Sequence, residues 1–88
     1  MSDIANVGRV LRTLRQTQNL SQIEVACKAD MNLSYYSRIE RGRGNPTLLK
    51  LFVILSALNI SFEDFCYLIS QEKFYYKPRF ARGPQNED

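Results

Sequence analysis

Polar side chains that can make specific hydrogen bonds gather between residues 20 and 47 of this 88-residue chain. Gln22 offers an amide, Ser34 and Ser37 offer hydroxyl groups, and Arg38 and Arg43 offer guanidinium groups with several N–H donors each. An arginine such as Arg38 can bind guanine through its O6 and N7 atoms, or bind a phosphate. The chemistry that these residues offer is therefore recognition by hydrogen bonds and charge.

The composition offers little for catalysis or metal binding. The chain has no histidine, which removes the commonest metal ligand and the usual general base. Cys27 and Cys66 are far apart and match no metal spacing, and the four glycines form no phosphate-binding loop. We expect no catalytic residue, no metal and no cofactor. We also expect both cysteines to be small buried hydrophobes on apolar helix faces.

Two short helices joined by a tight turn must position the polar side chains. Ser21 is a good N-cap, and Glu24 three residues later completes a capping box, which predicts a helix at about 22–29. Asn32 predicts the start of the next helix, at about 33–41, and the glycine that follows predicts its end. A compact pair of helices that cross at a wide angle is the usual device for laying a helix in the major groove of DNA.

Three further helices complete the predicted all-α fold. Apolar residues at helical spacing predict a first helix over about 3–18, closed by Asn19 in a left-handed conformation. The segment after Asn45-Pro46-Thr47 is apolar nearly all round, which predicts a central helix closed by a left-handed Asn59. A fifth helix follows Ser61 and has two apolar faces, of which one suffices for packing within the domain.

The chain resembles the Xre/Cro family, the lambda-repressor-like helix-turn-helix regulators, in the order and spacing of Leu20-Ser21-Gln22, Ser34-Tyr35-Tyr36-Ser37-Arg38-Ile39-Glu40-Arg41-Gly42 and Asn45-Pro46-Thr47. The resemblance runs from about Val7 to about Phe65. It implies a five-helix lambda-repressor-like DNA-binding domain over residues 1–70, with a short aromatic C-terminal extension over residues 71–88. Small stand-alone members of the family include restriction–modification controller proteins, phage repressors and some antitoxins.

The resemblance also implies which residues contact DNA. The family reads bases from the N-terminal half of its recognition helix, and the matching positions here are Leu33, Ser34, Ser37 and Arg38. Gln22 and Arg43 match positions that hold the phosphate backbone, and further phosphate contacts are expected from Ser21, Tyr35, Arg41 and Asn45. Leu33 departs from the polar residue often found at its position, and its apolar side chain would suit a thymine methyl group.

In this family an arginine late in the first helix pairs with the glutamate that ends the recognition helix. The matching residues are Arg15 and Glu40, and a buried pair would fix the angle of the recognition helix. Three alternatives stay open. In the first, Arg15 and Glu40 are exposed charges without a fixed partner. In the second, Arg38 pairs with a phosphate, with Glu24 or with Glu40. In the third, Gln22 is an ordinary exposed helix residue.

Charge and size favour a homodimer. The net charge is +3, and a single small domain reaches few phosphates and would bind DNA weakly. Two helix-turn-helix units about 34 Å apart fit successive major grooves, which predicts a homodimer on an inverted repeat. We expect the dimer interface to use Phe62, Phe65, Tyr67, Ile69, Phe74, Tyr75 and Tyr76. Three roles stay open for the aromatic extension: it packs on the subunit or its partner, it contacts nucleic acid, or it docks another protein.

The leading interpretation is a sequence-specific regulator that binds double-stranded DNA, as a homodimeric repressor or an autoregulatory controller. The alternative is a protein-interaction module, an antitoxin or anti-regulator that uses the fifth helix and the aromatic tail. No apolar run approaches the ~20 residues of a membrane span, and the first residues lack the basic region of a signal peptide. We therefore expect a cytoplasmic protein with no membrane contact and no small-molecule ligand.

Overall fold

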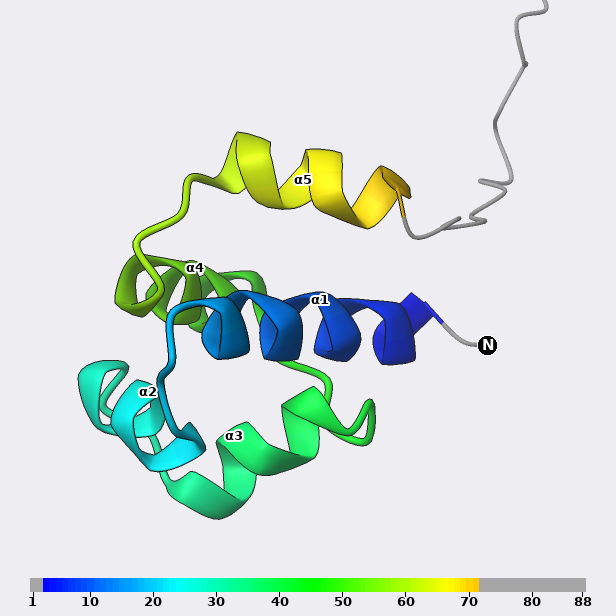
Figure 1. Cartoon of the computed structure of the whole chain (residues 1–88). Coiled ribbons are helices and arrows are strands. Elements are labelled where there is room, and N and C mark those ends of the chain that lie inside the picture. Colours follow the sequence, from blue (N-terminus) through cyan, green and yellow to red (C-terminus); the bar gives the residue numbers. More distant parts are fainter. Residues whose placement is uncertain (1–2, 72–88) are drawn as a thin grey trace, which may run out of the picture.

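The computed structural model describes residues 3–71, and this range folds into five helices without a strand (Figure 1). The helices are α1 (Asp3–Thr17), α2 (Gln22–Lys28), α3 (Leu33–Glu40), α4 (Leu48–Ala57) and α5 (Phe62–Gln71). α1 packs against α3 on one side and α5 on the other, while α2 packs against α3 and α4. The predicted five-helix all-α fold is confirmed, and the first three helices end within one residue of the positions expected from the sequence.

Local hydrogen bonds define where the helices start and stop. The Oγ atom of Ser21 accepts from the Glu24 N–H at 3.1 Å, and Oε1 of Glu24 accepts from the Ser21 N–H at 2.7 Å, so the predicted capping box is present. Each of the first four helices is followed by a residue with positive φ, namely Asn19, Asp30, Gly42 and Asn59. In each case the next residue donates its N–H to the carbonyl five residues earlier. Short-range chemistry therefore sets the helix–turn–helix spacing.

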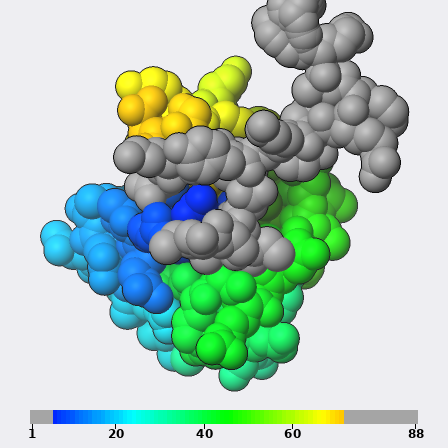
Figure 2. Space-filling view, turned by 90° about the vertical axis from the view of Figure 1, so that its right-hand side faces the viewer, coloured from blue at the N-terminus to red at the C-terminus, as the bar shows by residue number. Residues whose placement is uncertain are grey.

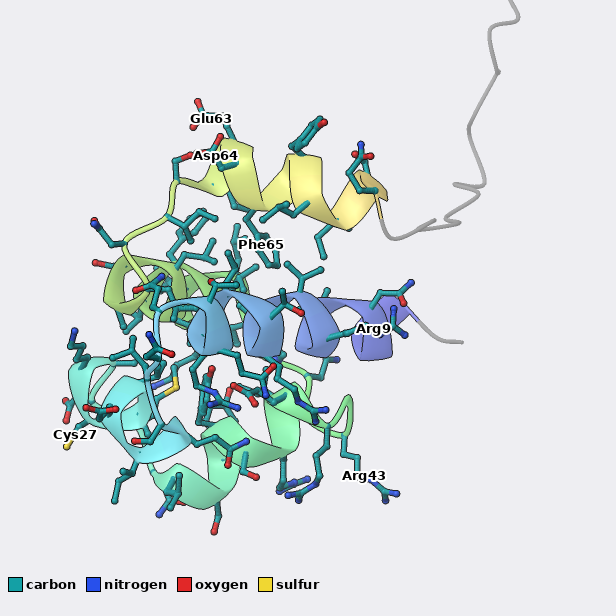
Figure 3. All side chains as sticks on the ribbon, in the orientation of Figure 1. Arg9, Cys27, Arg43, Glu63, Asp64 and Phe65 are labelled. Atoms are coloured by element: carbon teal, nitrogen blue, oxygen red, sulfur yellow. The ribbon has the colours of Figure 1, made fainter. Side chains whose placement is uncertain are left out.

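One cluster of buried side chains joins all five helices. Tyr36 and Ile39 are 0% and 1% exposed, which confirms the inward face predicted for α3. Phe65 points from α5 toward the same cluster (Figure 3). The other members come from α1, α2, α4 and the turns that follow α2 and α4: Val10, Leu11, Val25, Ala26, Ala29, Ile54, Leu55 and Leu58. This core holds α3 with its polar side outward.

α4 is not buried all round, so the prediction of a central helix is wrong. Ile54 and Leu55 are its buried residues, whereas four large apolar side chains are 41–75% exposed: Leu48, Leu49, Phe52 and Val53. The domain is small, and the neighbouring helices cover only one side of α4. The remaining apolar side is exposed in the part of the chain that the structure describes.

The expectation that both cysteines are buried is also wrong, because Cys27 and Cys66 are exposed. α2 has only seven residues, and its buried side is formed by Val25 and Ala26. Cys27 points away from the domain (Figure 3). The apolar character of a short helix therefore leads to an expectation of more buried residues than the core covers.

α1 passes very close to the end of α3 at Gly8. A Cβ atom built on Gly8 would lie 2.5 Å from the carbonyl oxygens of both Ile39 and Glu40. Figure 2, which views the side where α1 begins, shows the blue surface of α1 directly against the green surface of residues near 40. The absence of a side chain at Gly8 thus allows α1 to support the recognition helix.

We expect Gly8→Ala to lower the free energy of unfolding by about 1–3 kcal/mol, because the new methyl group must displace backbone atoms. Urea unfolding followed by circular dichroism measures this change. Gln16→Ala, at an exposed position of the same helix, is the control. An unchanged or raised stability of Gly8→Ala would show that the contact relaxes easily and that only the better helix propensity of alanine counts.

No single helix within residues 3–71 has both the length and the apolar composition needed to cross a membrane. Only α4 and α5 taken together reach that length and composition, and the two helices are bent by 99° relative to each other.

Candidate nucleic-acid interface

The outward side of α3 and the start of α2 form a groove. It is lined by Gln22, Leu33, Ser34, Ser37, Arg38 and Arg41. These residues comprise all four candidates for base contact and two of the candidates for phosphate contact. The helical period brings the α3 members to one face, and Asn32 sets the start of that helix by accepting the Tyr35 N–H at 3.2 Å.

Arg38 is available in this groove. Its side chain is exposed and forms no hydrogen bond or ion pair with any residue from 3 to 71, so the structure does not show the alternative pairing with Glu24 or Glu40. Nη1 of Arg41 donates to Oγ of Ser37 at 2.8 Å, which draws the Arg41 guanidinium back along α3. The groove therefore presents two guanidinium groups beside the apolar side chain of Leu33.

The remaining phosphate candidates lie outside the lining of this groove. Ser21 is exposed, and its hydroxyl caps α2. Tyr35 is half-buried and packs against the core. Arg43 and Asn45 are exposed in the connection between α3 and α4, where Arg43 points outward (Figure 3). Contact between these residues and phosphate stays a prediction.

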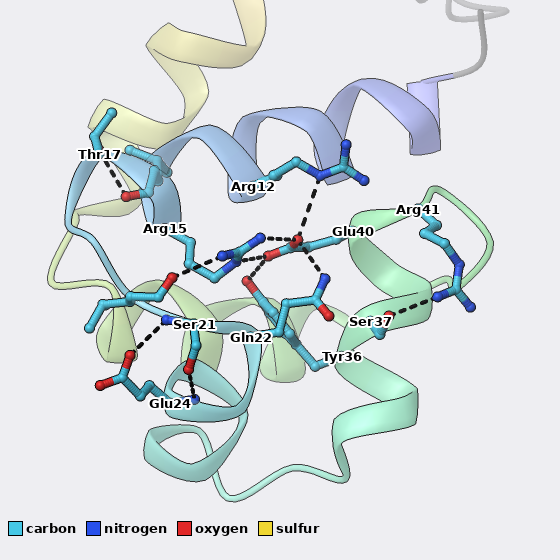
Figure 4. A network of polar contacts seen from close by, with 12 residues as sticks. Arg12, Arg15, Thr17, Ser21, Gln22, Glu24, Tyr36, Ser37, Glu40 and Arg41 are labelled. Atoms are coloured by element: carbon cyan, nitrogen blue, oxygen red, sulfur yellow. Dashed lines mark hydrogen bonds and ion pairs between the residues drawn. The ribbon is translucent and has the colours of Figure 1, made fainter.

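Below the groove, the Glu40 carboxylate is the centre of a polar network (Figure 4). Arg15 binds it through two bonds, from Nε to Oε2 at 2.7 Å and from Nη2 to Oε1 at 3.0 Å. Nε2 of Gln22 donates to Oε1 at 2.9 Å, and the Tyr36 hydroxyl donates to Oε2 at 2.5 Å. Arg15 also donates from Nη1 to the Leu20 carbonyl at 2.8 Å. The network thus connects α1, α2 and α3.

Burial and hydrogen bonding act in opposite directions on this carboxylate. The Glu40 side chain has no exposed surface, and burial alone would raise its pKa. The hydrogen bonds from Arg15, Tyr36 and Gln22 outweigh burial and hold the pKa of Glu40 below its ordinary value. Burial and the neighbouring carboxylate raise the pKa of Tyr36, so its hydroxyl stays a donor. Glu40 is therefore a buried, fully bonded anion.

The structure shows three partners of Glu40 that the sequence reasoning missed. Tyr36 lies four residues before Glu40, a spacing at which helical side chains meet, so this contact could have been inferred. Gln22 was expected only at phosphate. Arg12 approaches Glu40 with its Nε atom 3.7 Å from Oε1, and the sequence reasoning gave it no role.

The predicted dimer residues have different surroundings. Phe62 and Tyr67 are 43% and 64% exposed, and Ile69 is half-buried. Phe65 is in the core, so its side chain packs inside the subunit and not on the exposed face. The other three predicted residues, Phe74, Tyr75 and Tyr76, lie outside the described residues.

The exposed side of α4 adjoins Phe62. The rings of Phe52 and Phe62 meet edge to face with centroids 5.2 Å apart, so α4 and α5 share one apolar surface. We call this surface the α4–α5 face; its exposed apolar side chains are Leu48, Leu49, Phe52, Val53 and Phe62. Among residues 3–71, no three His, Cys, Asp or Glu side chains are grouped to hold a metal ion.

Comparison with known proteins agrees with this geometry. A helix-turn-helix family model, HTH_3, matches residues 11–65. The chain is 35% identical over 74 residues to the control protein C.MunI of Mycoplasma sp., covering 82% of this chain and 100% of C.MunI. Two longer curated regulators are matched over only 38% and 56% of their own length.

Solved structures of controller proteins have the same fold. The restriction–modification controller protein C.AhdI from Aeromonas hydrophila superposes with a TM-score of 0.69 at 32% identity, covering 72% of this chain and 96% of C.AhdI. The controller protein C.Esp1396I, crystallised as a tetramer with its natural 35 base-pair operator, gives a TM-score of 0.78 at 26% identity, covering 82% and 95%.

The chain therefore belongs to the Xre/Cro-like helix-turn-helix family, whose members are DNA-binding transcriptional regulators and not enzymes. Two of the solved structures similar to it, C.AhdI and C.Esp1396I, are restriction–modification controller proteins, and the chain covers 96% and 95% of their lengths.

Proposed function

We propose that this chain is a homodimeric repressor or autoregulatory controller that reads an inverted repeat in the major groove of double-stranded DNA. Residues 1–70 would form the DNA-binding domain, with α3 as its recognition helix. Residues 71–88 would form an extension with a possible role in the dimer. A regulator of this kind acts where the DNA is, in the cytoplasm. The α4–α5 face is the surface that we assign to the dimer contact.

The observation that carries this proposal is the groove on α3. Leu33, Ser34, Ser37 and Arg38 line it together, and the guanidinium group of Arg38 has no partner among residues 3–71. A guanidinium group free to enter the major groove can bind O6 and N7 of guanine. The remaining candidates would contact the sugar–phosphate backbone and set the position of α3: Ser21, Gln22, Tyr35, Arg41, Arg43 and Asn45.

The first experiment is selection from random duplex DNA at two salt concentrations, followed by affinity measurements on the selected operator. We expect an inverted repeat with half-sites about one turn apart. Arg38→Ala should weaken binding by about 5–150-fold per half-site and relax the preference at one base pair, which corresponds to about 1–3 kcal/mol. The basis is the exposed position of Arg38 in the groove.

Lys28→Ala is the matched control, since it removes one positive charge at the far end of α2. It should leave the selected sequence unchanged. The proposed reading of bases by α3 is wrong if the unmodified chain binds DNA but enriches no sequence. It is also wrong if Arg38→Ala binds the selected operator with the same affinity and base preference as Lys28→Ala. Absence of DNA binding by the unmodified chain would instead favour a protein-interaction module.

A further inference from the structure

The Glu40 carboxylate has no hydrogen-bonding capacity left. A carboxylate offers about four lone-pair positions. Two of them accept from Arg15, one accepts from Gln22 and one accepts from Tyr36, at distances of 2.5 to 3.0 Å. A fifth donor near Glu40 can therefore be attracted by the charge of the carboxylate without forming a hydrogen bond to it. The N–H groups of such a donor stay free to bind another acceptor.

Arg12 is this fifth donor. Its Nε atom lies 3.7 Å from Oε1 of Glu40, which is too long for a hydrogen bond, and its side chain is 45% exposed. Arg15 already compensates the single negative charge of Glu40, so Arg12 leaves one net positive charge at the surface. A guanidinium has five N–H donors, and those of Arg12 donate to no acceptor within residues 3–71, so they remain for an acceptor outside this part of the chain.

Arg12 lies beside a residue that is expected to hold the DNA backbone. Nε2 of Gln22 and Nε of Arg12 both approach the same oxygen, Oε1 of Glu40, at 2.9 and 3.7 Å. Figure 4 shows the two side chains reaching Glu40 from α2 and from α1. The side-chain amide nitrogen of Gln22 carries two hydrogens, so Gln22 keeps a second N–H after binding Glu40. The two side chains present neighbouring donors of which one carries a full charge.

We propose that Arg12, on α1 and outside the helix-turn-helix, is a further phosphate-binding residue of the DNA interface, next to Gln22. Glu40 holds it in place by charge and leaves its donors free. This inference rests on the proposed function, because the phosphate belongs to the DNA backbone. Arg12 would add affinity without reading sequence, since a phosphate contact is the same for every base pair.

The salt dependence of operator binding tests this inference. A residue that neutralises one phosphate contributes about 0.9 to the slope of log affinity against log salt concentration. Arg12→Gln should therefore reduce the slope by about 0.9 per subunit, or about 1.8 for a homodimer, and leave the selected sequence unchanged. Arg12→Lys, which keeps the charge, should restore the slope. Lys28→Gln is the control for loss of one positive charge.

The outcomes separate the possible roles of Arg12. A reduced slope for Arg12→Gln, with the slope kept in Arg12→Lys and Lys28→Gln, supports the contact. An unchanged slope overturns it. A lower thermal unfolding temperature with an unchanged slope also overturns it, because Arg12 would then act only by supporting Glu40. If the unmodified chain enriches no operator sequence from the random duplexes, the proposed function itself is rejected, and not only the contact made by Arg12.

Discussion

Replacing Arg15 with methionine is expected to lower the free energy of unfolding by about 3–5 kcal/mol. The change removes two hydrogen bonds from Glu40, whose side chain has no exposed surface, and one from the Leu20 carbonyl. Gln22 and Tyr36 are neutral and cannot replace the lost charge, and Arg12, 3.7 Å away with a side chain that is 45% exposed, compensates only part of it. A buried carboxylate without its main counter-ion is among the most costly groups in a protein interior.

The same substitution should reverse the pH dependence of stability. In the unmodified chain the pKa of Glu40 lies below its ordinary value of 4.5, so its contribution is present above that pH and is lost as the pH falls through the folded-state pKa. Without Arg15, two of the causes that lower this pKa are lost, and we expect burial, the largest single cause, to raise the folded-state pKa. The penalty should then be fully present at pH 7 and shrink as the pH falls toward 4.5.

Urea unfolding at pH 7 and pH 4.5 measures both effects. The double variant Arg15→Met/Glu40→Met is the control, and it should recover much of the lost stability, because it leaves no buried charge behind. A loss for Arg15→Met that is below about 1 kcal/mol, or that is the same at both pH values, would mean that Glu40 takes up water or another partner.

Placing aspartate at Leu49 should convert the protein from dimer to monomer and weaken operator binding by about 100-fold or more, because the linked second half-site is lost. Leu49 is 75% exposed in the single chain, so the substitution should hardly change the stability of the folded subunit. Its effect comes from a charge placed in the α4–α5 face, which a second copy is expected to cover. Analytical ultracentrifugation and operator titration measure the two quantities.

Asn59→Asp is the matched control, since it adds the same charge in a left-handed turn of a kind that Asp30 already occupies. It should leave both the oligomeric state and operator affinity nearly unchanged. If Leu49→Asp stays dimeric, the contact does not use α4. Tyr67→Asp, on the exposed side of α5, would then show whether α5 alone carries the interface.

Much of the fold follows from local sequence. The caps at Ser21 and Asn32 and the left-handed turns at Asn19 and Asn59 depend on bonds within a few residues, so the positions of the helices could be predicted. The pattern of Tyr36 and Ile39 likewise predicted the inward side of α3, and with it the outward position of the groove residues. Family resemblance then supplied the roles expected for those residues.

Other features depend on how the helices pack, and no local pattern contains them. The sequence made α4 apolar nearly all round, but only the tertiary structure decided which side the core covers and which side a partner must cover. Both cysteines are exposed for the same reason. Resemblance suggested that Arg15 meets Glu40, whereas the approach of Gln22 and Arg12 to one oxygen of that carboxylate arises only where α1, α2 and α3 meet. Capping is short-range and readable in the chain; burial and charge sharing are long-range and are decided by the packed structure.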